Sequence, residues 1–381
     1  MIRRSLWFRS PALALVALAM AGCAGSDFFQ PPLNQQPVLC GGSIQGIPLA
    51  LNGDVTTFAG TFGVFGNADG VGNAASFQEP YGITTDGLNL YVSDKDGDGL
   101  RKIEISSRQV STLVPQGGGL NEPVGITTDG AFVYVCDSNN DAIQKVDVNT
   151  GVMTLLAGGT SGAMDGVGPA AQFREPYGIT VVGDDLFVAD RDNHAIRRVN
   201  KNSGQVTTLA GAFATPGSTD GVGGDARFNE PMSVATDCTN LYVGDWNNYT
   251  VRKIVIATGE VTTFAGTTGQ PGTTNGFATG AQLLGPRGLT SDGRFLYVAD
   301  FYNRHGGQPI PVPEPVQESS LIRRIDLTNA EVITLAGAPD TFGAVDGQGA
   351  DARFRQPSGV TTDGRSLFVT DRQNNAVRQI Q

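Results

Sequence analysis

The stretch VSDKDGDGL, residues 92–100, places carboxylates at Asp94, Asp96 and Asp98 and follows the last of them with glycine. Alternate carboxylates of this kind form the first half of a calcium-binding EF-hand loop. Such a loop also needs a bidentate glutamate at its twelfth place, where this chain has Ile105. Asp and Asn side chains also cap the amides of tight turns. The stretch therefore favours a structural turn, with a weak, half-formed calcium site as the alternative.

The same stretch belongs to a sequence repeat. The text EPYGITTDGLNLYVSDKDGDGLRKIEISSRQVSTL, which begins at Glu79, returns in related form from Glu122, Glu175 and Glu230, and again from Gly285 and Gln356. Proline opens every copy, at positions 80, 123, 176, 231, 286 and 357. A repeat of this length is one supersecondary unit that buries its apolar face by stacking on its neighbours.

Each copy contains four short alternating or apolar runs. In the third copy these are residues 178–181, 185–189, 195–199 and 206–210, and tight turns such as Asn-Ser-Gly separate them. Asp-Gly between such runs is a strong hairpin signal because both residues tolerate positive φ. Four antiparallel strands in a unit of roughly 45 residues form the blade of a β-propeller. The sequence predicts an all-β, six-bladed β-propeller.

The sixth copy ends after its third strand, at residues 374–381. Its missing fourth strand has a counterpart near the start of the chain, where GDVTTFAG (residues 53–60) closely matches GEVTTFAG (residues 259–266). We therefore expect the N-terminal strand to complete the last blade, because closing the ring removes two exposed sheet edges. An alternative is that residues 43–52 supply a third strand and compete with the C-terminus.

The pattern Pro-x-Gly-Ile, then Leu-Tyr-Val-x-Asp, then Asn-x-x-Ile-Arg-Lys resembles the NHL-repeat family of β-propellers, and the likeness covers about residues 53–381. The resemblance implies the fold more strongly than an activity, because related propellers include binding modules, sensors and a few lyases. Within the repeat, Asp94 has an equivalent at the end of the second strand of every other copy. These are Asp137, Asp190, Asp245, Asp300 and Asp371. Recurrence in every blade favours an architectural role.

Loops after the second and fourth strands leave from one face of a propeller, and the long connections lie there. Their text DGxGxxAxF occurs at residues 69–77, 165–173, 220–228 and 346–354, where we expect Phe to pack between blades while Asp-Gly turns the chain. The largest insertion, residues 303–320, also leaves from this face, and its prolines favour an extended conformation. The candidate recognition patch is His194, Trp246, Tyr249, Phe301, Tyr302, Arg304 and His305. The alternative is that Trp246 and Tyr302 cover seams between blades.

The N-terminus predicts export. Arg3, Arg4 and Arg9 precede the short apolar run PALALVALAMAG, which ends at Gly22. Met20-Ala21-Gly22-Cys23 resembles the bacterial lipobox, which implies a signal peptide of residues 1–22 and lipid on Cys23. Residues 23–43 are expected to form a flexible tether and residues 44–381 the propeller. Ala24 after the cysteine resembles outer-membrane sorting, and an ordinary secretory signal is the alternative. Pairing among Cys40, Cys136 and Cys238 is left open.

Two function classes follow. The first is a monomeric, lipid-anchored, non-catalytic module of the cell envelope that binds a protein, peptide or glycan through the long-loop face. The second is a propeller enzyme, either a metal-dependent lactonase or hydrolase or a lyase-like protein, with carboxylates such as Asp190 and Asp300 at the channel mouth. The chain has only two histidines and no Gly-x-Ser-x-Gly motif, which favours the binding module without a cofactor. The formal net charge of −11 makes nucleic acid an unlikely partner.

Calorimetric titration with calcium tests the interpretation of residues 92–100. We expect no one-to-one isotherm, because the glutamate that completes such a loop is absent. A one-to-one isotherm that disappears when Asp96→Ala and Asp98→Ala are combined would instead establish a calcium site.

Overall fold

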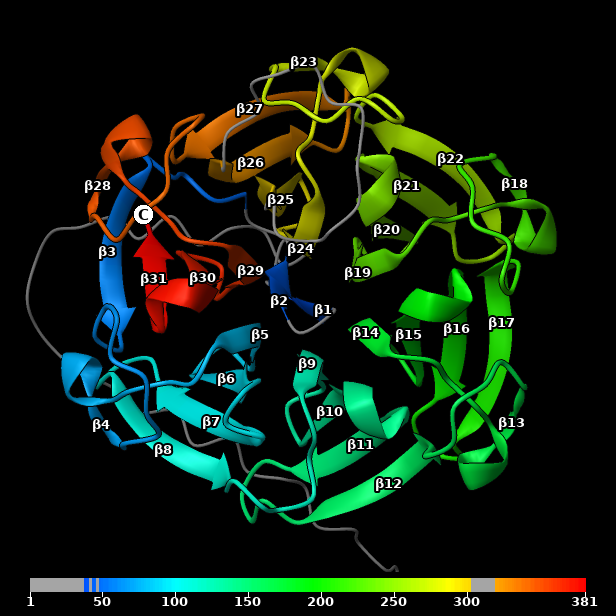
Figure 1. Ribbon diagram of the computed structural model, residues 1–381, viewed down its shortest axis with the longest axis horizontal. Helices are drawn as coiled ribbons and strands as arrows, with labels where there is room; N and C mark the ends of the chain where they lie inside the picture. Colours follow the sequence, from blue (N-terminus) through cyan, green and yellow to red (C-terminus); the bar gives the residue numbers. More distant parts are fainter. Residues whose placement is uncertain (1–37, 41–42, 46–47, 303–318) are drawn as a thin grey trace, which may run out of the picture.

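The computed structural model describes residues 38–40, 43–45, 48–302 and 319–381. Six antiparallel sheets stand in a ring around a central channel (Figure 1), which confirms the predicted six-bladed β-propeller. We number blades 1 to 6 by their innermost strands, which are β5 (Pro80–Thr85), β9 (Pro123–Thr128), β14 (Pro176–Val182), β19 (Pro231–Thr236), β24 (Pro286–Ser291) and β29 (Pro357–Thr362).

The second and third strands of each blade follow outward, and the predicted strands of blade 3 all form. Second strands are β6 (Asn89–Asp94), β10 (Phe132–Asp137), β15 (Asp185–Asp190), β20 (Asn240–Asp245), β25 (Phe295–Tyr302) and β30 (Leu367–Asp371). Third strands are β7 (Gly99–Glu104), β11 (Ala142–Asp147), β16 (Ala195–Asn200), β21 (Thr250–Val255), β26 (Ser319–Asp326) and β31 (Ala376–Ile380). Fourth strands are β8 (Gln109–Val114), β12 (Met153–Gly158), β17 (Gln205–Gly211), β22 (Glu260–Ala265), β27 (Glu331–Ala336) and β3 (Asp54–Ala59).

The ring closes as predicted. Strand β3 pairs with β31 in blade 6, with Val55 opposite Ile380 and Ala59 opposite Val377. The carbonyl of Gln381 also accepts hydrogen bonds from the N–H groups of Asn52, Gly53 and Asp54 at 3.0, 2.9 and 3.0 Å. Both ends of the propeller are therefore held in one sheet. The alternative in which residues 43–52 supply a third strand of this sheet is wrong, because β30 and β3 flank β31 on both sides.

Five blades carry a short fifth strand on the outside, which the four-stranded prediction missed. These strands are β4 (Gly70–Val71), β13 (Gly166–Val167), β18 (Gly221–Val222), β23 (Gly276–Phe277) and β28 (Gly347–Gln348). Each is part of a long connection and pairs with the start of the fourth strand. Blade 2 lacks it, because residues 115–122 connect blades 1 and 2 directly.

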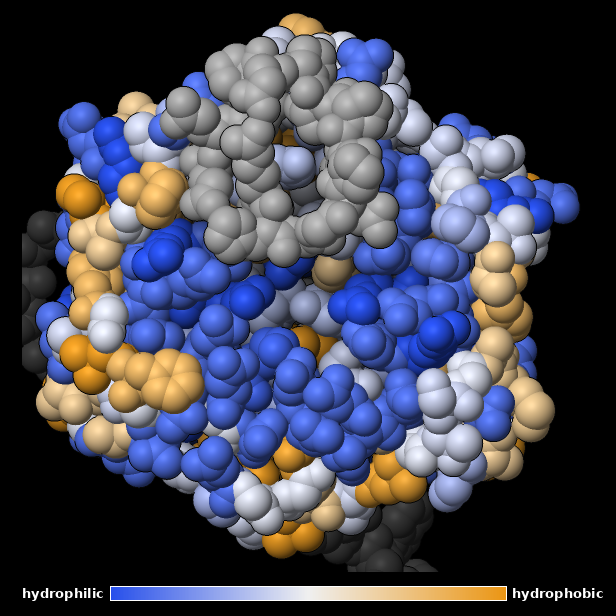
Figure 2. Space-filling model, in the orientation of Figure 1, coloured by the Kyte–Doolittle hydropathy of each residue, from blue (hydrophilic) through white to orange (hydrophobic). Residues whose placement is uncertain are grey.

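Short 3-10 turns lie at two recurring places. In the long connections they are η2 (Gly72–Ala74), η4 (Gly168–Ala170), η6 (Gly223–Asp225), η8 (Ala278–Gly280) and η10 (Gly349–Asp351). Between second and third strands they are η3 (Ser138–Asn140), η5 (Arg191–Asn193), η7 (Trp246–Asn248) and η11 (Arg372–Asn374). We call the face that carries the second group the upper face; it is the face seen in Figures 1 and 2.

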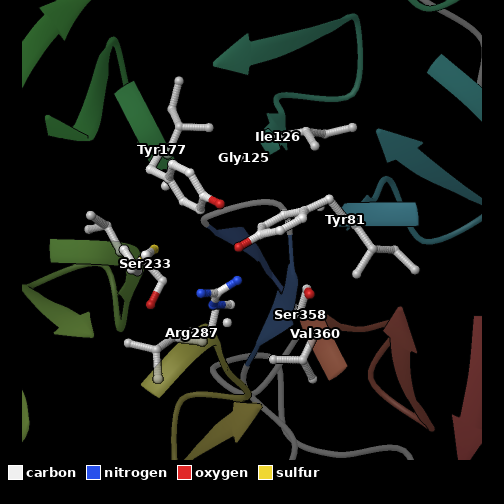
Figure 3. A pocket seen from close by; sticks show the side chains of 17 residues that line it. Tyr81, Gly125, Ile126, Tyr177, Ser233, Arg287, Ser358 and Val360 are labelled. Atoms are coloured by element: carbon white, nitrogen blue, oxygen red, sulfur yellow. The ribbon is translucent and has the colours of Figure 1, made fainter. Parts of the chain in front are cut away.

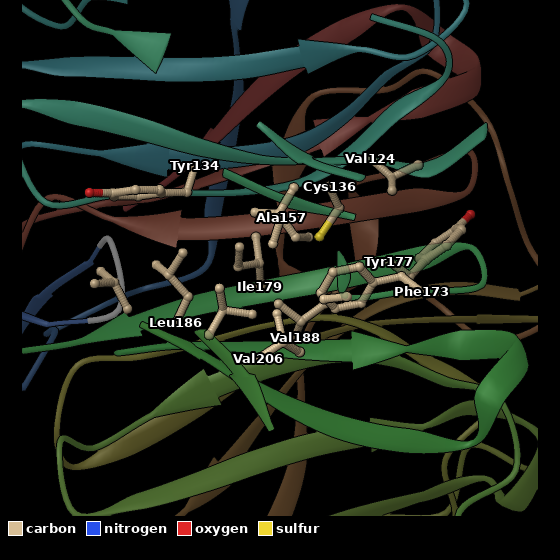
Figure 4. Packing of buried hydrophobic residues seen from close by; sticks show 14 of the residues in the cluster. Val124, Tyr134, Cys136, Ala157, Phe173, Tyr177, Ile179, Leu186, Val188 and Val206 are labelled. Carbon is tan, nitrogen blue, oxygen red and sulfur yellow. The ribbon is translucent and has the colours of Figure 1, made fainter. Parts of the chain in front are cut away.

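Apolar side chains from adjacent blades form the core. Between blades 2 and 3, Cys136, Ile143, Ile179 and Val188 pack together with the ring of Phe173 (Figure 4). Cys136 is free and fully buried, so it acts here as a small apolar residue. Cys238 is disulfide-bonded, and its partner is not among the side chains that the structure describes.

A two-stranded hairpin lies in the middle of the ring. Strand β1 (Val38–Cys40) pairs with β2 (Ser43–Gln45), and β2 contacts the innermost strands β5, β24 and β29. Farther along the chain, the N–H of Leu49 donates to Asp292 at 2.9 Å, in the turn between the first two strands of blade 5. That turn belongs to the lower face, so the N-terminal segment reaches blade 6 along that face.

The glycine of the Pro-x-Gly pattern is explained by the crowding of the innermost strands. A Cβ atom on Gly288 would lie 1.9 Å from the carbonyl oxygen of Ser358 in the next blade. A Cβ on Gly125 would lie 2.0 Å from the carbonyl oxygen of Tyr177. Real Cβ atoms do not approach backbone oxygens this closely, so the diameter of the ring depends on these glycines.

We predict that Gly288→Ala destabilises the protein by about 3 kcal/mol or more, because the backbone of blade 6 must move to admit one methyl group. Chemical denaturation followed by tyrosine and tryptophan fluorescence measures this loss. Gly224→Ala is the matched control, since nothing lies within 4 Å of a Cβ at that position. Equal stability of the two variants would show that the innermost strands can separate at little cost.

Candidate ligand site at the mouth of the central channel

The strand-end aspartates are architectural. In blade 3, Asp190 is fully buried, and its Oδ1 accepts the N–H of Arg174 at 2.8 Å. Its Oδ2 accepts hydrogen bonds from Arg197 Nη1 at 2.6 Å and Asn193 Nδ2 at 2.8 Å. Burial raises the pKa of Asp190 to about 6, against the opposing field of Arg197. Each oxygen already has protein partners, so Asp190 is not available as a metal ligand. Asp245 and Asp371 have the same partners in blades 4 and 6.

The other end of the buried arginine explains the DGxGxxAxF motif. Arg197 Nη2 donates to Asp165 Oδ1 at 2.7 Å and to the carbonyl of Met164 at 3.1 Å. The ring of Phe173 lies 5.2 Å from the Arg197 guanidinium carbon. The motif therefore supplies both a carboxylate and an aromatic face to the arginine, in addition to the predicted turn and packing.

Blade 2 is the exception that supports this explanation. It has no long connection, and Gln144 stands where the other blades have arginine. Gln144 Nε2 donates to Asp137 at 3.0 Å. Where the long connection is absent, the arginine that would contact it is absent too. In blade 5 the long connection supplies Asn275 in place of the aspartate, and its Oδ1 accepts a hydrogen bond from Arg323 at 3.0 Å.

The three alternate carboxylates of residues 94–98 have separate roles. Asp94 Oδ1 accepts the N–H of Gln78 at 2.6 Å, and burial raises the pKa of Asp94 to about 7. Asp98 Oδ1 accepts the N–H of Glu122 at 2.8 Å, whereas Asp96 lies 3.5 Å from Lys95 Nζ. Within the described residues, no three His, Cys, Asp or Glu side chains are placed to hold a metal ion.

The predicted recognition patch is largely divided among structural roles. His194 Nδ1 accepts the N–H of Glu230 at 3.1 Å, which ties blade 3 to blade 4. Asp141 makes the equivalent bond to Glu175 at 2.8 Å. Burial lowers the pKa of His194. Tyr249 and Phe301 are buried, Trp246 and Tyr302 are partly buried, and Arg304 and His305 lie outside the described residues.

A rim of glutamates surrounds the channel on the upper face. Glu79, Glu122, Glu175 and Glu230 each precede the proline of a blade and have positive φ angles of 58°, 49°, 48° and 54°. Three of these carboxylates have cation partners. Glu79 meets Arg372 at 2.9 Å, Glu122 meets Lys95 at 2.7 Å, and Glu175 pairs with Arg191. Among the described residues, Glu230 has no cation within ion-pair distance. Burial raises the pKa of Glu230, and Arg191 and Arg287 oppose that rise.

Inside this rim, the residue after the proline faces the channel mouth in every blade except blade 2. These residues are Tyr81, Tyr177, Met232, Arg287 and Ser358, whereas Val124 of blade 2 packs in the core between blades. Together with glycine, serine and aliphatic residues of the innermost strands, the five line a cavity of about 60 Å³. Figure 3 shows the hydroxyl of Tyr81 and the guanidinium of Arg287 pointing toward one another in this space. From outside, mostly hydrophilic residues surround a central hollow (Figure 2).

Arg287 is the side chain that most clearly breaks the repeat. Its guanidinium carbon lies 4.7, 5.2 and 6.0 Å from the ring centres of Phe301, Trp246 and Tyr81. Among the described residues it has no ion pair, and its Nε is buried without a hydrogen-bond partner. Trp246 and Phe301, which belong to the predicted patch, thus both contact Arg287, which the prediction did not include.

Two further polar groups in the cavity wall lack partners. The hydroxyls of Tyr81 and Ser233 belong to side chains that are 4 % and 6 % exposed, and neither makes a hydrogen bond of ordinary geometry. The rings of Tyr81 and Tyr177 pack edge to face at 5.4 Å. Burial raises the pKa of Tyr81 far above its usual value, so this phenol stays protonated at neutral pH.

Sequence reasoning missed Arg287, Tyr81 and Tyr177 because it searched the longest loops. A signal was present in the repeat itself. The position after the proline varies from copy to copy, whereas its neighbours recur, and arginine occurs there once in the six copies.

Comparison with known proteins finds curated relatives, some of them described as NHL repeat-containing, and no protein-family model matches the chain. NHL repeat-containing protein 2 of Bos taurus is 27 % identical over 260 residues, which are 59 % of this chain and 33 % of the relative. Protein SUPPRESSOR OF QUENCHING 1, chloroplastic, of Arabidopsis thaliana is 31 % identical over 314 residues, 72 % of this chain and 28 % of the relative. The chain thus spans about a third of the length of these relatives.

Solved structures share the fold. A structural genomics protein of unknown function from Bacteroides thetaiotaomicron has a TM-score of 0.65 at 21 % identity, over 86 % of this chain and 75 % of its own. An auxiliary nutrient binding protein from the same organism has a TM-score of 0.64 at 18 % identity, over 86 % and 76 % of the two chains. Identities this low establish the architecture alone. In the part of the chain that the structure describes, no helix is long and apolar enough to cross a membrane.

We predict that Arg197→Gln destabilises the protein by about 3 to 5 kcal/mol, because it leaves the buried Asp190 without its charge partner. Arg198→Gln is the control. The neighbouring Arg198 is exposed and pairs with Asp185 at the surface, so its loss should cost about 1 kcal/mol or less. Combining Asp190→Asn with Arg197→Gln should recover part of the loss. Urea denaturation compares the variants, and similar losses for Arg197→Gln and Arg198→Gln would contradict an architectural role.

Proposed function

Since the chain belongs to the NHL-repeat family of β-propellers, we propose that it is a binding module whose ligand enters the mouth of the central channel on the upper face. Arg287 is the anchor of this site. The ligand inserts one polar group between Arg287, Tyr81 and Ser233, and the rest of the ligand lies against the rim. The module recognises its ligand without transforming it.

The observation that carries this proposal is the set of unpartnered polar groups in one small cavity. Leaving a buried donor or acceptor unsatisfied costs about 1 to 3 kcal/mol per group, and more for a charged one. In the cavity wall this applies to the hydroxyls of Tyr81 and Ser233. Arg287 beside them has no ion pair among the described residues. Its Nε also lacks a partner, but that atom alone does not mark a site, because the same is true of the structural arginines Arg101, Arg197, Arg252, Arg323 and Arg378. A bound ligand that accepts these hydrogen bonds removes the cost, so the empty site is already shaped for one.

The lining favours recognition over acid–base chemistry. Among the described residues that form the cavity wall, none is His, Cys, Asp, Glu or Lys. Proton transfer in a transition state usually needs such a group within hydrogen-bond reach of the substrate. The cavity wall instead offers hydrogen-bond donors and an aromatic surface. Solved propellers of similar fold that are described as auxiliary nutrient binding proteins, from Bacteroides thetaiotaomicron and Bacteroides ovatus, support the same conclusion by analogy.

The location of the module follows from the N-terminal sequence. We propose that the chain is exported, cleaved before Cys23 and held by lipid on that cysteine, with the propeller in the cell envelope. Cys23 and the preceding signal lie outside the described residues. The ligand is then a molecule of that compartment, either free or as the end of a protein, peptide or glycan, because the cavity admits one small group.

A thermal-shift screen of small metabolites, peptides and sugars tests this function. A ligand present at about 100 times its Kd should stabilise the native protein by about 2.7 kcal/mol, which raises its Tm measurably. Ser358→Tyr should abolish that shift, because it fills the cavity with the residue that blades 1 and 3 carry at the same position.

Ser111→Tyr, on the exposed fourth strand of blade 1, is the control and should keep the full shift. If Ser358→Tyr fails to fold, Met232→Tyr at the equivalent position of blade 4 replaces it. A ligand whose shift survives in the folded cavity-filled variant binds elsewhere, and the proposed site is then wrong.

A further inference from the structure

We infer that the ligand is a small zwitterion of the amino-acid type, whose carboxylate pairs with Arg287 and whose ammonium group pairs with Glu230. This inference rests on the proposed function and gives the site a ligand class.

The environment of Arg287 suits a carboxylate. Aromatic rings of Phe301 and Trp246 lie against the guanidinium at 4.7 and 5.2 Å, which fixes its plane and leaves its N–H groups for a planar acceptor. Arginine binds carboxylates through two parallel hydrogen bonds, and these are stronger than bonds between neutral groups. The Tyr81 hydroxyl in the same wall is a further donor without a partner.

The surrounding charges disfavour a phosphate. Among the described residues, the rim and the adjoining turns carry more carboxylates than cations, and these groups act on one another electrostatically. The carboxylates are Glu79, Glu122, Glu175, Glu230, Asp96 and Asp192, and the cations are Lys95, Arg174, Arg191, Arg287 and Arg372. A doubly charged anion at the mouth would be repelled by the excess of negative charge, whereas a zwitterion adds no net charge.

Glu230 provides the second half of the site. The other rim glutamates are neutralised by Arg372, Lys95 and Arg191, but among the described residues Glu230 has no ion pair. Its blade and that of Arg287 are adjacent, because β19 and β24 are neighbouring innermost strands. Arg287 already acts electrostatically on Glu230. In the described part of the chain, Arg287 and Glu230 thus lie on neighbouring blades without an ion-pair partner, although the side chain of Asn247 also hydrogen-bonds Glu230. This is the arrangement that an α-amino acid complements.

A difference between blades in one position of the repeat explains why, among the rim residues that the structure describes, Arg287 and Glu230 lack ion-pair partners. Where blades 1, 3 and 6 have Lys95, Arg191 and Arg372 directly after the strand-end aspartate, blades 4 and 5 have Trp246 and Phe301. The cations that neutralise the rim elsewhere are thereby replaced by aromatic rings, and these rings pack on Arg287.

Isothermal titration calorimetry with the full-length mature protein tests this inference. The probes are glycine, alanine, leucine and phenylalanine, the matched acids acetate and propionate, the matched amino-acid methyl esters, and inorganic phosphate. At least one free amino acid should bind more tightly than its matched acid, its methyl ester and phosphate.

Arg287→Met, the residue that blade 4 carries at this position, should weaken amino-acid binding by about 100-fold, because the buried charge partner of the carboxylate is lost. Arg287→Lys keeps the charge but loses the planar set of N–H donors. Its affinity for amino acids should therefore lie between that of the wild-type protein and that of Arg287→Met. Glu230→Gln should weaken amino-acid binding by about 10-fold and leave acetate or propionate binding unchanged. Arg294→Met and Glu260→Gln, which remove exposed charges away from the channel, should change nothing.

Three outcomes overturn the zwitterion. The first is that phosphate binds more tightly than any amino acid, and the second is that Glu230→Gln weakens the binding of simple acids as much as that of amino acids. The third is that amino acids bind with unchanged affinity to a folded Arg287→Met variant. If amino acids fail to bind but a ligand from the thermal-shift screen is still lost in Ser358→Tyr, the ligand class is wrong and the site at the channel mouth stands. A ligand that is unaffected by Ser358→Tyr instead overturns the site itself.

Discussion

The buried ion pair between the second and third strands is the interaction on which the rest of the propeller depends. In blade 3, the Asp190 carboxylate holds Arg197, the turn residue Asn193 and the backbone just before the innermost strand. The same arginine reaches the loop carboxylate of Asp165. Two charges removed from water stabilise a fold only when good geometry and further hydrogen bonds compensate for the lost hydration. One pair therefore fixes two strands, one turn and one long connection in each blade that carries it.

This constraint also separates the positions that the architecture fixes from those left free to vary. Strand crowding accounts for the glycine two residues after the proline, which only blade 4 replaces, with Ser233, and the buried pair accounts for the strand-end aspartate. The residue directly after the proline has no such duty, and in every blade except blade 2 it lines the channel mouth. Its occupants there are Tyr81, Tyr177, Met232, Arg287 and Ser358. The scaffold thus presents five variable side chains on a rigid ring, which is where a repeat protein can acquire a site without weakening its fold.

How much of this could be predicted depends on how local each feature is. The strands, their order and the pairing of β3 with β31 follow from short patterns that recur, so the sequence predicts them. The two-residue outer strands carry too few residues for any periodicity, and the contacts that hold their loops, such as that of Asp165 with Arg197, join residues 32 positions apart. The candidate patch named Trp246 and Phe301 from their residue types, but it omitted Arg287. Contact among these three requires two adjacent blades to be placed side by side, which no single copy of the repeat reveals.

The two kinds of arginine in the ring show why the channel mouth is a site and not a defect of packing. Arg197 is fully buried, and its terminal nitrogens meet two carboxylates and two carbonyls. Arg287 has rings on its faces but no carboxylate within ion-pair distance among the described residues. The same chain therefore pairs a buried guanidinium with carboxylates where it needs rigidity, and among the described residues it leaves the partly buried guanidinium of Arg287 at the channel mouth without such a partner. A ligand with a carboxylate supplies the acceptor that completes the same kind of pair there.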